Sequence, residues 1–212
     1  MKLHSESFAD GQPIPERCAM GTPTGFGGNR NPQLAWDDVP AGTRSFVLWC
    51  VDPDVPTVAE MVGKPGAEIP VEQPRCEFTH WLLADIPATV HEIAEGAWSD
   101  GVTPPGKSTI KAAGENPPAP PHPARVGLND YTKWFAGDAT MGGDWCGYDG
   151  PYPPANDLRL HHYVFRLFAL DVEQLDLPKR FAIDQVLTAM QGHVLDEARW
   201  VGTYSLHPGQ HR

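Results

Sequence analysis

The sequence has little positive charge and few cysteines. Its 212 residues carry 16 Lys and Arg against 27 Asp and Glu, a formal net charge of −11 at pH 7. Because such a chain repels phosphate backbones at long range, we do not expect it to bind nucleic acid. The four cysteines form no CxxC pair and have no histidine at finger spacing, which argues against a zinc finger.

The sequence also lacks long apolar runs and internal repeats. No run reaches the length needed to cross a membrane, and Met1–Met20 lacks the apolar centre of a secretory signal. We therefore expect a cytoplasmic protein with reduced thiols and no integral membrane association. No repeat at the period of solenoids or propellers is present either.

Proline and glycine are abundant instead, with 23 and 21 residues. Proline is excluded from helix interiors and cannot donate to a strand ladder, so many residues must lie in turns and loops. Two segments, at about 57–75 and 99–126, are long connections of this kind. We expect one domain, residues 1–212, that carries them as loop insertions.

Three runs are rich in β-branched and aromatic residues and predict strands. They cover 44–51, which should end at Asp52, then 77–84, and 161–170. The third has apolar residues on both faces, which predicts a strand in the core of the protein. The fold class is therefore mainly β.

One C-terminal helix is predicted, with Asp184 as its N-cap. Gly192 should weaken it by about 1 kcal/mol relative to alanine. Its apolar stripe, at helical spacing, consists of Val186, Leu187, Met190, Val194 and Ala198.

The segment Asp52-Pro53-Asp54-Val55-Pro56 carries two carboxylates two residues apart. Proline favours an extended conformation for the residue before it, and an extended chain points both carboxylates to one side. Proximity then raises the pKa of one carboxyl, which becomes a hydrogen-bond donor to an anion. The alternative is a rigid turn whose aspartates cap backbone amides. The sequence does not choose between the two.

Two further features carry candidate ligand-binding residues. His80 lies in a predicted strand beside Trp81, where a histidine is either a core residue or a ligand. The stiff segment 147–154 suits a preformed pocket wall that loses little entropy on binding. Beyond it, alternation along the strand sends His161 and Tyr163 to one face. Each feature also has an ordinary structural explanation.

Together, DPDVP, HW, GYDGPYPP and HHYVF resemble, in order and spacing, the phosphatidylethanolamine-binding protein family. Its members are also called Raf kinase inhibitor-like proteins, and the similarity is greatest to the bacterial branch. It continues upstream through Gly28–Trp36 and Pro40–Ser45, and downstream through Ala189–Leu195.

The resemblance implies two antiparallel sheets packed as a Greek-key β-sandwich, with few helices. It also implies a pocket for phosphate, phosphorylethanolamine or acetate-like anions, inhibition of a kinase or protease, and a homodimer. The bond before Pro56 would be a cis peptide. The residues that the resemblance places at the pocket are Asp52, Asp54, His80, Gly150, Pro151, His161 and Tyr163.

These observations predict a binding protein without catalytic activity, cofactor or metal. Two imidazoles would donate hydrogen bonds to an anion, and binding should strengthen as pH falls from about 8 to 6 with histidine protonation. The alternative is a hydrolase or metalloenzyme that uses the Asp and His cluster. Against a hydrolase, the sequence lacks a GxSxG elbow and has no cysteine beside the histidine motifs.

Overall fold

The computed structural model describes residues 1–107 and 123–210 of the chain. Most of its regular structure is β-strand, in sheets of six, three and two strands. In sheet order, the six-stranded sheet contains β2 (Gln12–Pro13), β11 (Val194–Tyr204), β10 (His161–Leu170), β6 (Ser45–Pro56), β7 (Arg75–Pro87) and β9 (Arg125–Val126).

The smaller elements surround this sheet. The three-stranded sheet contains β1 (Lys2–His4), β5 (Leu34–Asp37) and β8 (Glu92–Ile93), and the two-stranded sheet contains β3 (Gly21–Thr22) and β4 (Gly25–Phe26). The described residues also form the α-helices α1 (Tyr131–Trp134) and α2 (Ile183–Ala189) and the 3₁₀ turns η1 (Glu16–Cys18) and η2 (Ala59–Met61).

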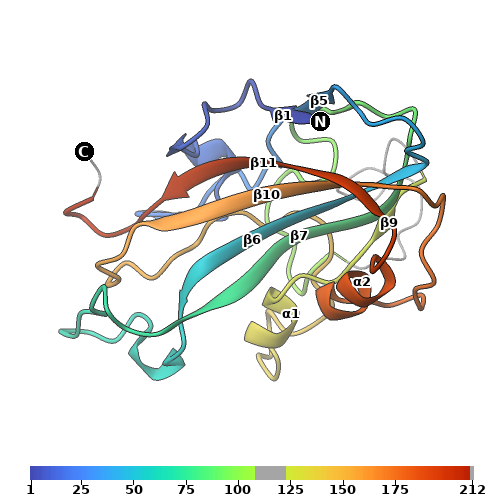
Figure 1. Ribbon diagram of the computed structural model, residues 1–212. Helices are drawn as coiled ribbons and strands as arrows, with labels where there is room; N and C mark the ends of the chain where they lie inside the picture. The colour runs from blue at the N-terminus through green and yellow to red at the C-terminus, as the bar shows by residue number, and fades with distance from the viewer. Residues whose placement is uncertain (108–122, 211–212) are drawn as a thin grey trace.

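The four long strands β11, β10, β6 and β7 cross the molecule side by side (Figure 1). They pair antiparallel with one another, whereas the short contact between β11 and β2 is parallel. In Figure 1, β1 and β5 lie on one side of this sheet, and α1 and α2 lie on the other. The mainly β fold predicted from the sequence is confirmed, and so is the packing of one sheet on another that the family resemblance implies, with a third, two-stranded sheet beside them.

The central sheet buries apolar side chains on both faces. On β6, Phe46 and Leu48 belong to the core shared with β1, β5 and β8, whereas Val47 and Trp49 belong to the core under α2. Strand β10 behaves in the same way, which confirms the prediction that it is a core strand. This double burial explains why both strands have near-continuous apolar sequences.

Strand β6 runs past the point where the sequence analysis ended it. Asp52 to Pro56 stay in the strand because β7 also begins early, so that Pro56 pairs with Arg75. The register shifts between Asp52 and Val55, which marks a bulge. The predicted cis peptide before Pro56 is wrong: within the two described ranges, the cis peptide bond precedes Pro105.

The C-terminal helix is shorter than predicted. It ends at Ala189, and its N-cap is Ala182, not Asp184. Gly192 has a φ of +81°, a conformation that glycine adopts readily, and it turns the chain into β11. Ala198 therefore pairs with Leu167 as a strand residue instead of continuing a helical stripe.

The two proline-rich segments differ in how much of them the structure describes. The first, 57–75, contains η2 and returns to the sheet at Arg75. The second, 99–126, ends in β9, which pairs with β7, but its residues 108–122 lie outside the described ranges.

Candidate functional site

A pocket of about 460 Å³ opens at the end of the central sheet where β6, β7 and β10 carry polar side chains. Its polar floor consists of Asp52, His80, His161 and Tyr163. Its aromatic wall consists of Phe78 on β7, Tyr131 and Trp134 on α1, Phe135 directly after α1, and Tyr152, which follows Pro151. We call these two sets the floor and the aromatic wall.

The structure brings all four floor residues together from three strands, as the sequence analysis expected. The other three predicted site residues do not line the pocket. Asp54 turns to a different set of partners, described below. Gly150 is buried and its N–H donates to Asn29, whereas the Pro151 carbonyl accepts from residues 20 and 21.

The ring of His161 lies between two carboxylates and contacts both. Its Nδ1 lies 2.6 Å from Asp52 and its Nε2 lies 3.1 Å from Asp157, and the ring is 1% exposed. Burial alone would lower the pKa of His161, but the hydrogen bonds to Asp157 and Asp52 outweigh it and raise the pKa to about 9. His161 is therefore a fixed cation at neutral pH, and both of its N–H groups are already used.

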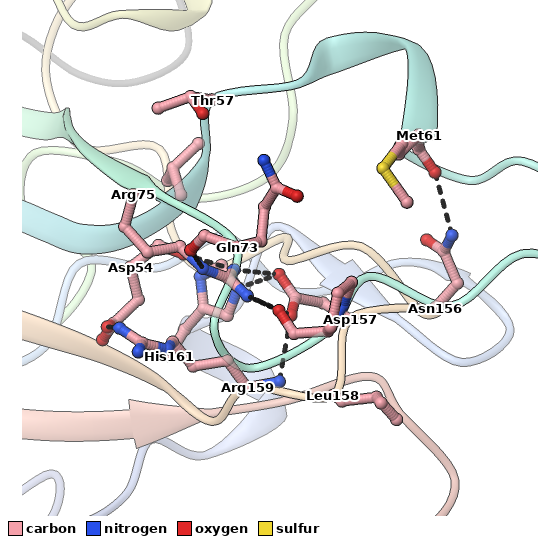
Figure 2. Close-up of polar contacts among 12 residues, drawn as sticks. Asp54, Thr57, Met61, Gln73, Arg75, Asn156, Asp157, Leu158, Arg159 and His161 are labelled. Carbon is pink, nitrogen blue, oxygen red and sulfur yellow. Dashed lines mark hydrogen bonds and ion pairs between the residues drawn. The ribbon is translucent and has the colours of Figure 1, made fainter.

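Asp157 is held in turn by Arg75 (Figure 2). The guanidinium makes two hydrogen bonds to this carboxylate, of 2.5 and 3.0 Å, and a third, of 2.9 Å, to the carbonyl of Asp54. Burial raises the pKa of Asp157, but hydrogen bonds from His161 and Arg75 lower it to about 2. Neither residue is among the predicted site residues, because each lies outside the motifs and only folding brings Asp157 to His161 and Arg75 to Asp157.

Asp54 belongs to a neighbouring cluster. Its carboxylate accepts hydrogen bonds from Arg159 at 3.0 Å and from Nδ1 of His162 at 2.8 Å. Burial pushes the pKa of Asp54 up, but these bonds dominate and leave it below its ordinary value. Asp54 is therefore not the protonated carboxyl that one of the two interpretations of this segment requires, because two basic partners surround it.

His80 has one ring nitrogen fixed and the other free. Nδ1 donates to the carbonyl of Asp149 over 2.7 Å, and Nε2 has no hydrogen-bond partner within 1–107 and 123–210. The ring packs at 5.0 Å from Phe78 and from Tyr163, and burial lowers its pKa below 6.5. At neutral pH His80 is thus uncharged, and Nε2 is an unprotonated nitrogen at the pocket floor.

The Tyr163 hydroxyl is the other unused polar group of the floor. The residue is 1% exposed, and no described residue meets its oxygen in hydrogen-bond geometry, although the Asp52 carboxylate is near enough to act on the hydroxyl. Burial, together with the charge of Asp52, raises the pKa of Tyr163 well above its ordinary value, so that the hydroxyl keeps its proton. A buried donor without a partner is uncommon in folded proteins and marks a place for a ligand or a water molecule.

The aromatic wall reaches the surface of the protein. Trp134 is 43% exposed and Tyr152 is 42% exposed, and Phe26, at 56%, packs edge-on against Tyr152 with a centroid distance of 6.2 Å. Large exposed aromatic side chains around a pocket are typical of binding sites. The arrangement therefore suits a ligand with a small polar head and an apolar body.

Within the described ranges, no three His, Cys, Asp or Glu side chains are grouped so that they could hold a metal ion. None of the described helices is long and apolar enough to span a membrane.

Comparison with known proteins gives a consistent result. The model of the family named phosphatidylethanolamine-binding protein matches residues 4–205. The UPF0098 protein of Aquifex aeolicus is 32% identical over 204 residues, which cover 96% of this chain and 88% of that protein. The UPF0098 protein YbhB of Escherichia coli is 31% identical over 177 residues, or 84% and 82% of the two chains.

Solved structures agree with these matches. The crystal structure of a phosphatidylethanolamine-binding protein homologue from Chlamydia trachomatis has 27% identity and a TM-score of 0.62, with 96% of both chains covered. Escherichia coli YbcL, at 24% identity, has a TM-score of 0.66 over 96% of this chain and 97% of its own, and shows the fold alone.

Proposed function

The chain belongs to the phosphatidylethanolamine-binding protein family, and we propose that it binds a small anionic head group on the pocket floor. The observation that carries this proposal is the unpartnered hydroxyl of Tyr163 beside the free Nε2 of His80. The hydroxyl supplies one hydrogen-bond donor at once. The ring nitrogen supplies a second when it is protonated.

Anion binding at this floor takes up a proton. An unprotonated Nε2 repels a phosphate or carboxylate oxygen, whereas a protonated ring adds a donor and a positive charge. His161 stays charged but cannot turn to the ligand, because Asp52 and Asp157 occupy both of its nitrogens. The ligand is therefore held by His80 and Tyr163, and His161 balances the charge of the aspartates beneath them.

The ligand is a phosphoryl or carboxylate group attached to an apolar body. The head group would meet the floor, and the body would lie against the aromatic wall, whose outer members Trp134 and Tyr152 are exposed. Phosphate, phosphorylethanolamine and a phosphorylated side chain share this head-group chemistry. The exposed aromatics also suit a protein partner, because Trp and Tyr are enriched at interface hot spots.

The protein acts by binding and not by catalysis in this proposal. Two floor residues that could serve as general base are already hydrogen-bonded: both nitrogens of His161 face carboxylates, and Asp52 accepts from His161 and from the backbone of Asp54. His80 has a free nitrogen but no nucleophilic hydroxyl or thiol is its hydrogen-bond partner in the described part of the chain. Inhibition of a kinase or protease and a homodimer stay predictions that follow from the family, and a cytoplasmic location stays a prediction from the sequence.

An NMR titration tests this proposal. Inorganic phosphate and phosphorylethanolamine are added to the ¹⁵N-labelled protein at pH 6, next to a Leu187→Ala control, whose side chain is exposed on α2 away from the pocket. We expect saturable shifts at His80, Tyr163 and the aromatic wall, equal in the control. An absence of shifts at the floor with either compound would overturn the proposal.

A further inference from the structure

A second polar cluster lies behind the pocket, and every member of it is buried. It joins residues that are far apart in the sequence, and none of them is more than 3% exposed. Its members are Asn29, Ser99, Lys107, Asn129 and Asp149. Asp149 lies in the segment 147–154 and Asn29 in Gly28–Trp36, but none of the five is among the predicted site residues, and Lys107 comes from the proline-rich segment 99–126.

The carboxylate of Asp149 is the centre of this cluster. It forms an ion pair with Nζ of Lys107 and accepts hydrogen bonds of 2.8 Å from the amides of Asn29 and Asn129. Lys107 also donates to the carbonyl of Tyr148 over 2.8 Å. A buried ion pair is stable only when its remaining hydrogen bonds are satisfied, and here they are.

The backbone of Asp149 makes two hydrogen bonds to His80. Its N–H donates to the His80 carbonyl over 3.0 Å, and its carbonyl accepts from Nδ1 of the His80 ring over 2.7 Å. Any movement of Asp149 therefore moves the group that decides which nitrogen of His80 carries the proton. Such an outer partner normally fixes the tautomer of a functional histidine.

We propose that Lys107 and Asp149 are a positioning pair that holds His80 in the Nδ1–H tautomer with Nε2 free at the pocket floor. The inference rests on the proposed function only for its consequence in binding. The pair touches neither the pocket nor a ligand: neither residue lines the cavity. It acts through the ring of His80.

The pair also sets the charge around His80. Asp149 favours the protonated ring, and its carboxylate is paired with the ammonium of Lys107, whose positive charge would act in the opposite sense. Removing Lys107 alone should raise the pKa of His80, and neutralising Asp149 alone should lower it. A general loosening of the structure would shift both variants in one direction. The other charged or titratable groups that face the ring are Asp52, Asp130, Tyr131, His161 and Tyr163.

The experiment records the ring nitrogens of His80 by NMR in ¹⁵N-histidine-labelled full-length protein, without ligand, from pH 4.5 to 8. The wild type should show the Nδ1–H tautomer. Lys107→Met and Asp149→Asn should shift the pKa in opposite directions, and the double variant should lie between them. The matched control is Arg125→Met, which breaks the Arg125–Asp85 pair elsewhere in the fold and should leave His80 unchanged.

Phosphate binding at pH 6 is then measured on the same variants. We expect Lys107→Met to strengthen it and Asp149→Asn to weaken it, each by up to about tenfold, because the shifted pKa changes the fraction of His80 that is protonated at pH 6. If phosphate does not bind even the wild type while the NMR pattern holds, the proposed function fails and the positioning pair stands.

The inference itself is overturned if the wild-type ring carries its proton on Nε2, or if both single variants shift the pKa of His80 in the same direction or not at all. Should Lys107→Met not fold, the wild-type tautomer and the direction of shift in Asp149→Asn decide the question.

Discussion

Nδ1 of His161 lies 2.6 Å from a carboxylate oxygen of Asp52, with both side chains buried at the floor of the pocket. Because Asp157 occupies the other nitrogen, the imidazolium is a structural cation and not the pH-sensitive ligand group. The pH-sensitive ligand group is instead His80, whose pKa is lowered by burial. Anion binding should therefore strengthen at a lower pH than the range from 8 to 6 that the sequence predicts.

Anion affinity should be nearly constant between pH 8 and 7 and rise below about pH 6.5, where His80 takes up its proton. Sulfate is the suitable probe, because it does not titrate in this range. The measurement is a series of calorimetric titrations from pH 8 to 5. A rise that is complete by pH 7, or an affinity that falls on acidification, would contradict the assignment to His80.

The stability of the fold should depend on the charge of His161. Its folded pKa of about 9 lies above the ordinary 6.5, so its stabilisation is fully present below pH 6.5 and is lost as pH rises through 9. We expect the free energy of unfolding to fall by at most about 3 kcal/mol over this window. Urea denaturation at several pH values measures it. In His161→Gln, whose side chain cannot be charged, the free energy of unfolding should not fall over this window. The same pH dependence in both proteins would contradict a stabilising charge on His161.

Arg75 should be essential to the fold. Arg75→Met leaves the buried carboxylate of Asp157 without its main partner, and we expect a loss of about 3 kcal/mol or more. The control is Arg44→Met, which breaks a pair with Glu173 whose side chains are 57% and 71% exposed and should cost less than about 1 kcal/mol. Equal losses in chemical denaturation would show that the pocket floor does not depend on Arg75.

The aromatic wall should affect only ligands that have an apolar body. Trp134→Ala should leave the affinity for inorganic phosphate within about twofold, and weaken a short-chain phosphatidylethanolamine below its micellar concentration by about tenfold. Fluorescence or NMR titration separates the two. Loss of phosphate binding in this variant would place the head group at the rim instead of at the floor.

The sequence predicts the strands that are buried on both faces. The run 161–170 matches β10 at both ends because apolar residues on both faces leave few alternatives. Asp52–Pro56 was expected to leave the sheet, since Pro and Asp are typical of turns. The pairing of Pro56 with Arg75, a long-range contact, overrides that local preference.

The site was predicted only where its residues lie on strands. Asp52, His80, His161 and Tyr163 follow from strand ends and from the family motifs, and they meet at the floor. Lys107 and Asp157 lie in irregular segments without periodicity or motif. Their partners are 42 and 82 residues away in the sequence, at Asp149 and Arg75, so no local pattern identifies them.

Tyr163→Phe tests the central claim most directly. The hydroxyl has no partner in the described structure, so its removal should change the free energy of unfolding by less than about 1 kcal/mol. The dissociation constant for phosphate at pH 6, measured by calorimetry, should nevertheless rise about tenfold, because the ligand loses a buried donor. An unchanged dissociation constant in a variant of unchanged stability would mean that the anion does not bind at this floor.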